Sequence, residues 1–149
     1  MKGASIIFPT LTVLIGICFA SCDLPKDPED SLRKAEEDKL RVGVVEHPPY
    51  VERSGEGWMG EEVDLIEGFA KANNLQIEYV SGNESDLIKE LEEYHLHLVV
   101  GGFEEGTVWK SHVTPSHVYD AEHVFLLAPG ENRLLYRIEQ FLSDRMEER

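Results

Sequence analysis

The stretch LQIEYVSGNESDLIKELEEYHLHLVVGG, residues 75–102, decides the fold class of this chain. Residues 75–80 alternate apolar and polar side chains, which is typical of a strand with one buried face. Asn83 has the residue type of a helix N-cap, with Asp86 three positions later. The helix that follows would end at Tyr94 and bury Leu87, Ile88 and Leu91. Residues 96–100 then predict a second strand, which Gly101-Gly102 would end. A strand, a helix and a strand in this order indicate an α/β sheet with parallel neighbours.

The flanking sequence continues this alternation. Further strands are expected at 40–45 and 122–128, and further helices at 61–73 and after Gly130. The helix faces expected to be buried consist of Val63, Ile66, Phe69 and Ala70 in the first of these helices and of Leu134, Leu135, Ile138, Phe141 and Leu142 in the last. The predicted fold is therefore a mostly parallel or mixed sheet flanked by helices on both faces. In such sheets ligands bind beyond the carboxyl ends of the strands.

The first residues carry the features of a bacterial secretory signal. A basic start at Met1-Lys2 precedes an apolar run over 4–20, and Phe19-Ala20-Ser21-Cys22 closes it with small residues and a cysteine. These four residues resemble the lipobox of bacterial lipoproteins, which implies cleavage before Cys22 and lipidation of its thiol. The alternatives are an ordinary signal peptide or a membrane-spanning helix. A span needs roughly 20 apolar residues, and the run over 4–20 is shorter than that. The expected location is extracytoplasmic and lipid-anchored. In an organism with two membranes, it would be the periplasmic face of the inner membrane.

The composition indicates where this signal ends and the domain begins. Residues 23–39 contain two prolines, many charges and few large apolar side chains, which is typical of a flexible linker. The expected organisation is a signal peptide over 1–21, a linker over 22–39 and a single domain over 40–149. The chain has 29 acidic and 14 basic residues and a net charge of −15, which argues against a nucleic-acid partner. No disulfide is expected, because Cys18 leaves with the signal and Cys22 carries lipid.

Five segments, taken in order, resemble the bacterial solute-binding protein family 3, the extracellular receptors of polar amino-acid ABC importers. Each matches one of the family's local patterns, from the first strand and its "PPY" turn to a segment like "v.FS.PY". The matching segments are Leu40–Val45, Pro48–Tyr50, Trp58–Leu65, Leu87–Gly102 and Val113–Tyr119.

The resemblance implies a periplasmic-binding-protein-like fold of type II, in which two α/β lobes close on a ligand. Here the second lobe is missing, because the chain passes from Tyr119 directly to the strand expected at 122–128. The resemblance also implies the function of a transporter substrate-binding protein. It would bind a small solute without catalysis and pass it to an ABC permease or another membrane protein.

The pocket residues of the family carry over only in part. In the family, a Thr or Ser and an Arg after the third strand bind the carboxylate of the ligand. In this chain Trp109 stands at the Arg position and Gly106 at the Thr position, with Thr107 one residue later. Glu104 and Glu105 add negative charge there, so we expect a polar solute that is cationic or aromatic. The expected ligand-binding residues are Tyr50, Trp58, Glu61, Gly102, Phe103, Thr107, Trp109 and Tyr119, although the aromatic members have packing against the core as an alternative role.

Other kinds of chemistry have little support in the sequence. His95 and His97 would share one face of a strand, but the histidine spacing matches no closed zinc motif, and no metal or cofactor is expected. No nucleophile elbow, metalloprotease motif or phosphate-binding loop is present, so the chain is not expected to be an enzyme. The alternative function is a protein-interaction or sensor module. It would use the exposed former cleft to contact a membrane partner or a second copy of the chain as a homodimer.

Overall fold

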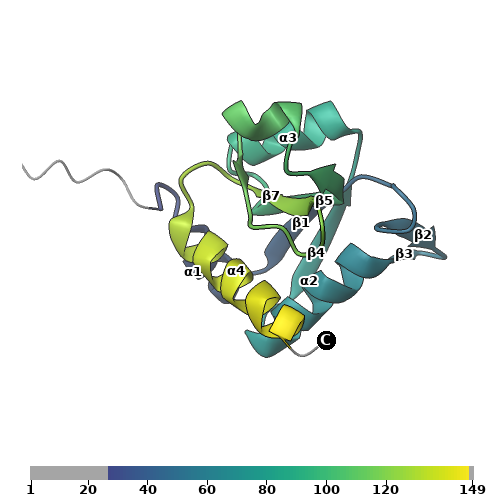
Figure 1. The fold of residues 1–149 in the computed structure, drawn as a ribbon. Coiled ribbons are helices and arrows are strands. Elements are labelled where there is room, and N and C mark those ends of the chain that lie inside the picture. The colour runs from purple at the N-terminus through teal and green to yellow at the C-terminus, as the bar shows by residue number, and fades with distance from the viewer. Residues whose placement is uncertain (1–26, 148–149) are drawn as a thin grey trace, which may run out of the picture.

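A five-stranded mixed sheet forms the centre of the computed structural model, which describes residues 27–147 (Figure 1). Its strands are β1 (Leu40–Val44), β4 (Ile77–Ser81), β5 (Leu98–Glu104), β6 (Thr114–Pro115) and β7 (His123–Leu127). A separate hairpin consists of β2 (Glu52–Ser54) and β3 (Gly57–Met59). The helices are α1 (Ser31–Glu37), α2 (Glu61–Ala72), α3 (Glu84–Glu92) and α4 (Asn132–Glu147), and η1 (Val108–Ser111) is a short 3-10 helix. The strand order is β4-β1-β5-β7-β6, and β7 runs antiparallel to both of its neighbours.

Helices cover both faces of this sheet, as the sequence predicts. Figure 1 shows α3 on one side and α1, α2 and α4 on the other. The side chains of β5 alternate between the two cores, so that Leu98 and Val100 pack with α2 and α4 while Val99 and Phe103 pack with α3. The predicted faces of α2 and α3 are confirmed, since all of their expected apolar members are buried. In α4, Leu134, Ile138 and Leu142 are buried, and Leu135 and Phe141 are half-buried.

The prediction that Gly101-Gly102 ends its strand is wrong. β5 continues through both glycines to Glu104, with an irregularity in its pairing to β7 between Val99 and Phe103. The strand continues because a side-chain carboxylate, described below, accepts hydrogen bonds from both glycine N–H groups. Gly102 has a φ of 66°, and a Cβ there would lie 2.6 Å from atoms of His47 and Tyr50. Only glycine allows this close approach.

The prediction of a flexible linker through residue 39 is also wrong over α1. Leu32 and Ala35, one helical turn apart, are buried against the core that α2 and α4 share. The charged residues around them mask this short apolar face in the sequence. The predicted signal peptide and Cys22 lie outside the described residues. Over 27–147, no helix combines the length and apolarity that crossing a membrane requires.

His97 is a buried histidine whose ionisation is tied to folding. It precedes β5, so the expectation that His95 and His97 share a strand face is wrong: His97 is buried and His95 is exposed. The Nδ1 atom of His97 accepts a hydrogen bond of 3.0 Å from the Arg41 N–H, which requires the neutral ring. Burial, and then the positive charge of Arg41, lowers the pKa of His97 to about 4.

We therefore predict that His97 makes stability fall with decreasing pH between about 6.5 and 4. In this window the unfolded chain binds a proton that the folded His97 ring does not, because the folded pKa is the lower one. Urea unfolding at pH 7 and pH 4.5 should show a contribution of about 2.5 kcal/mol from this residue. The His97→Asn variant keeps an acceptor near Nδ1 but has no such proton, so it should lose that part of the pH dependence.

His117→Asn is the matched control, because the His117 side chain is 79% exposed. It should retain the wild-type pH dependence. Equal pH dependence in the wild type and in His97→Asn would contradict the assignment.

Candidate functional site

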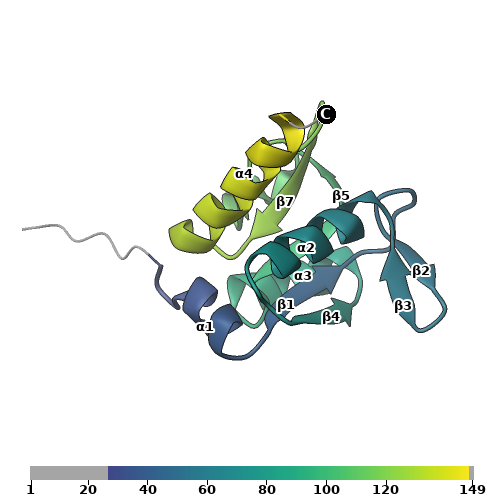
Figure 2. The same ribbon diagram turned by 90° about the horizontal axis from the view of Figure 1, so that it is seen from below.

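The carboxyl ends of β1 and β5 bring two loop segments to the same end of the sheet. We define this carboxyl edge as residues 46–50, which follow β1, together with residues 102–109, which extend from the end of β5 into η1. Figure 2 shows the β2–β3 hairpin at this end of the molecule and α1 at the opposite end. The edge is therefore the region in which the sequence predicts ligand binding.

A single buried carboxylate organises the carboxyl edge. The Glu62 side chain is 0% exposed, and its Oε2 atom accepts hydrogen bonds of 2.6 and 3.0 Å from the N–H groups of Gly101 and Gly102. Its Oε1 atom accepts a hydrogen bond of 2.7 Å from the Tyr119 hydroxyl. Burial raises the pKa of the Glu62 carboxyl, and the hydrogen bonds from Gly102, Tyr119 and Gly101 oppose that shift. Glu62 thus ties the first turn of α2 to β5 and to the segment that precedes β7.

Sequence reasoning missed this role, since it treats the acidic residues of the helix as a solvated face. Glu61 and Glu62 are adjacent on α2 and point in different directions, since Glu61 is exposed and Glu62 is buried. The burial of Glu62 could have been predicted from its position on the helix. It lies four residues before Ile66 and seven before Phe69, and therefore on the buried face.

Aromatic rings and imidazoles pack beside this carboxylate. The rings of Tyr50 and His123 have centroids 4.3 Å apart, and His123 Nδ1 lies 2.8 Å from an Asp120 oxygen. Burial raises the pKa of the Tyr50 hydroxyl, and the negative charges of Asp120 and Glu61 raise it further. Glu122 and Glu62 act in the same direction. The field at Tyr50 is therefore one that favours cations.

The structure brings some of the predicted ligand-binding residues together. Tyr50 lies against Gly102, since a Cβ added to that glycine would lie 2.6 Å from a ring carbon of Tyr50. Thr107 caps η1, because its Oγ1 atom accepts a hydrogen bond of 3.4 Å from the Trp109 N–H. The indole N–H of the half-buried Trp109 donates to Glu84 in the first turn of α3. Trp109 is thus directed toward α3.

Other predicted residues lie in the interior or on the flank. Phe103 and Tyr119 are each 6% exposed and pack in the two cores, as the packing alternative expects. Trp58 is half-buried on β3, and the Arg53 guanidinium carbon lies 4.5 Å from its ring centroid.

Glu61 and Tyr119 line a hollow of about 410 Å³, and the other predicted ligand-binding residues are not part of its lining. It lies between α2, α4 and the segment before β7, and its volume is within the range of small-molecule sites, about 300–1,000 Å³. Its lining residues are Glu61, Asp64, Leu65, Tyr119, Asp120, Leu142, Arg145 and Met146. Three carboxylates face one guanidinium there, so this hollow is also electronegative.

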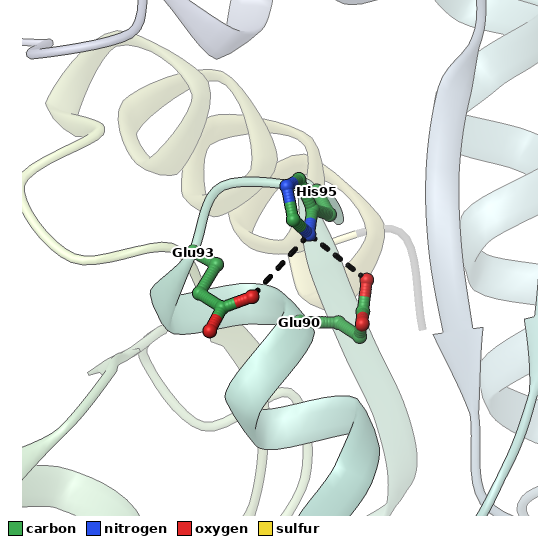
Figure 3. A group of neighbouring side chains, drawn as sticks. All are labelled: Glu90, Glu93 and His95. Atoms are coloured by element: carbon green, nitrogen blue, oxygen red, sulfur yellow. Dashed lines mark hydrogen bonds and ion pairs between the residues drawn. The ribbon is translucent and has the colours of Figure 1, made fainter.

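One group of side chains in the described residues has ligand atoms close enough to hold a metal ion. His95 Nδ1 lies 3.1 Å from a Glu90 oxygen and 3.6 Å from a Glu93 oxygen, at the C-terminal end of α3 (Figure 3). Imidazole and carboxylates are suitable zinc ligands. All three side chains are exposed enough for water to compete, and the Lys89 ammonium lies 3.9 Å from Glu93. The group sits at the end of α3 remote from Trp109 and the carboxyl edge.

Solved structures share this arrangement of sheet and helices. A Phe-to-Trp mutant of the arginine-bound form of domain 1 from TmArgBP superposes with a TM-score of 0.70 at 20% identity, covering 79% of this chain and 98% of that one. This chain has the same fold as that single domain. The predicted fold class and the predicted resemblance to a single lobe are therefore confirmed at the level of the fold.

Two further structures extend the comparison. The ancestral cationic amino acid solute binding protein AncCDT-1 gives a TM-score of 0.71 at 12% identity, covering 79% of this chain and 94% of that chain. A putative ABC transporter binding component from Wolinella succinogenes, complexed with lysine, gives 0.50 at 24% identity, covering 54% of this chain and 36% of that chain. No family model and no curated protein matches the sequence.

We predict that removing the Glu62 carboxylate destabilises the lobe far more than removing its neighbour. Glu62→Ala leaves one buried and one half-buried N–H group and one phenol without an acceptor, which should lower the free energy of unfolding by about 2–4 kcal/mol. Tyr119→Phe removes one donor and should cost about 1 kcal/mol. Urea unfolding of both single variants and the double variant measures the coupling between the two side chains.

Glu61→Ala provides the control, because it removes an exposed carboxylate from the same helix turn and should change stability by less than about 0.5 kcal/mol. Losses of similar size at Glu61 and Glu62, or additive effects of Glu62→Ala and Tyr119→Phe, would refute the organising role of Glu62.

Proposed function

We propose that this chain is a membrane-tethered, extracytoplasmic solute-binding protein of the ABC-import type, reduced to one lobe. It binds a small organic cation at the carboxyl edge and catalyses no reaction. The observation that carries this proposal is the fold of the lone lobe, since a lone domain with the same fold crystallised in an arginine-bound form.

The chemistry of the edge supports a cationic solute. Trp109 replaces the Arg that binds a carboxylate in the family pattern, and Glu104 and Glu105, shortly before it in the sequence, are both exposed. Aromatic faces and carboxylates attract guanidinium and ammonium groups. An arginine-like or polyamine-like solute suits this edge better than an acidic one.

The open edge implies weak binding. Ligand pockets bury most of their ligand, and in a clamshell the second lobe provides the other wall. The lone lobe exposes one side of the solute to water. High local concentration near a membrane partner, such as an ABC permease, would compensate for low affinity.

The proposed tether is a lipid on Cys22. Its support is the order of basic start, apolar run and small residues before that cysteine. Incorporation of labelled palmitate into the wild type, and its loss in Cys22→Ser, would test this element of the proposal separately from solute binding.

The first test is thermal unfolding of the chain from residue 22 onward, with Cys22→Ser, in the presence of arginine, lysine, putrescine or glutamate. Cations at about 100 times their dissociation constant should stabilise the lobe by about 2.7 kcal/mol, and glutamate should have no effect. Trp109→Ala should weaken the affinity for the cation about threefold to tenfold. Trp109→Phe keeps an aromatic face while losing the indole N–H, so it should retain most of the affinity.

The proposal fails if none of these compounds changes the unfolding midpoint. A concentration-dependent dimer in size-exclusion chromatography, indifferent to all solutes, would instead support the protein-interaction alternative.

The second test concerns charge. Glu105→Gln removes a carboxylate at the edge and should lower cation affinity about threefold, an effect that diminishes in high salt because exposed charges are screened. Glu36→Gln makes the same change on α1, at the other end of the lobe, and should leave the affinity unchanged. Titration calorimetry at low and high salt distinguishes the two variants. Equal losses of cation affinity in the two variants would mean that the affinity depends on the net charge of the lobe and not on the carboxylates at the edge.

A further inference from the structure

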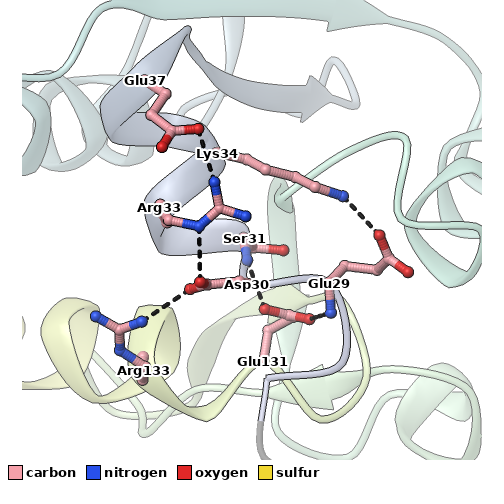
Figure 4. Close-up of polar contacts among 8 residues, drawn as sticks. All are labelled: Glu29, Asp30, Ser31, Arg33, Lys34, Glu37, Glu131 and Arg133. Carbon is pink, nitrogen blue, oxygen red and sulfur yellow. Dashed lines mark hydrogen bonds and ion pairs between the residues drawn. The ribbon is translucent and has the colours of Figure 1, made fainter.

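The residues before α1 are fastened to the start of α4 by a buried carboxylate. Glu131 is 2% exposed, and its two carboxylate oxygens accept hydrogen bonds of 2.7 Å each from the N–H groups of Glu29 and Ser31 (Figure 4). We call this contact between residues 27–31 and residues 130–133 the clasp. Because its central acceptor is buried, the clasp is a built element of the fold.

Further contacts hold the clasp closed on both sides of Glu131. The Asp27 N–H donates to the Gly130 carbonyl at 3.1 Å, and the Arg133 N–H donates to Asp27 Oδ1 at 2.6 Å. The Arg133 guanidinium also pairs with Asp30 at 2.8 Å. Together with the buried Leu32 of α1, these contacts fix the chain on the lobe from Asp27 onward.

The clasp lies at the end of the lobe opposite the carboxyl edge. It joins residues 27–31 to the start of α4. Strand β7, which precedes α4, runs away from the carboxyl edge because it is antiparallel to β5, and α4 runs back toward that edge. Leu142, near the other end of α4, lines the hollow together with Tyr119 and Asp120. The 16 residues of α4 span about 24 Å, so the clasp and the carboxyl edge are separated by roughly that distance. Figure 2 shows α1 and the carboxyl end of β1 at opposite ends.

The chain between a lipid on Cys22 and the clasp is short in comparison. Five peptide units join Cys22 to Asp27, and five extended residues reach at most about 18 Å. A lobe turned with its carboxyl edge against the bilayer would hold Asp27 roughly 24 Å or more above the surface. With the clasp closed, the tether is too short for that orientation.

We infer that the clasp holds the lobe with α1 and the start of α4 at the membrane and directs its carboxyl edge away from the membrane. This inference rests on the proposed lipid anchor. It means that the solute meets the edge from the side remote from the bilayer, and that a membrane partner reaches the edge only through a part that projects past the lobe. Opening the clasp would release residues 27–31 and lengthen the tether by at most about 18 Å, while α1 stays docked through the buried Leu32 and Ala35.

Energy transfer to the membrane surface tests the inference in the acylated full-length product. A donor dye is placed on a single introduced cysteine, either at Lys39, directly before β1, or at Val108, which is 79% exposed in η1. The protein is reconstituted into vesicles that carry acceptor-labelled lipid headgroups. Transfer from Lys39→Cys should exceed transfer from Val108→Cys about twofold or more, because the carboxyl edge lies about 24 Å farther from the surface.

Two variants separate the clasp from the tether. Glu131→Ala opens the clasp and should raise transfer from Val108→Cys, while urea unfolding verifies that this variant is folded. Insertion of a Gly/Ser segment of about 20 residues between Lys26 and Asp27 leaves the clasp intact, lengthens the tether and should make the two positions similar. Glu139→Ala, farther along α4, is the control and should behave as the wild type.

The possible results are distinguishable. If mass spectrometry finds no lipid on Cys22, then the proposed anchor and this orientation both fall. If the protein is acylated but Val108→Cys and Lys39→Cys transfer equally with the clasp intact, then only the orientation is overturned and the proposed function stands.

Discussion

The carboxyl edge depends on the burial of one carboxylate, that of Glu62. Removing a charged group from water costs several kcal/mol, and here three hydrogen-bond donors from two other parts of the chain offset that cost. In return, the start of α2 is fixed to β5 and to Tyr119. The same contact allows β5 to continue through Gly101-Gly102 and to place Gly102 beside Tyr50. The lobe therefore has an ordered edge.

This arrangement divides the acidic residues into two functional groups. The acceptor atoms of Glu62 are occupied within the lobe, so this residue supports the edge without offering its charge to a solute. Glu61, Glu104 and Glu105 are exposed and provide the field that a cation would meet. In the same way, Glu131 fastens the segment before α1 at the other end of the lobe. Two buried glutamates thus organise the two ends of the molecule, one at each end of the sheet.

The sequence allowed most of the fold to be predicted, because hydrophobic periodicity reports burial directly. The faces of α2 and α3, the N-cap at Asn83 and the mixed sheet all agree with the structure. The errors lie where a distant partner overrides a local pattern. Glu62 extends β5 through two glycines, and Glu131 orders a segment whose composition is that of a linker. Neither partner can be identified from local sequence, although the place of Glu62 on the apolar face of α2 was a usable signal.

The central claim is that a lone lobe binds an organic cation at the carboxyl edge that Glu62 organises. Mapping of amide and indole chemical shifts by NMR during an arginine titration tests it most directly. The account predicts saturable shifts at Gly102, Thr107 and the Trp109 indole, with the amides of α1 unchanged. Saturable shifts confined to Leu142 and Arg145 in the hollow, or no saturable shift at all, would contradict it.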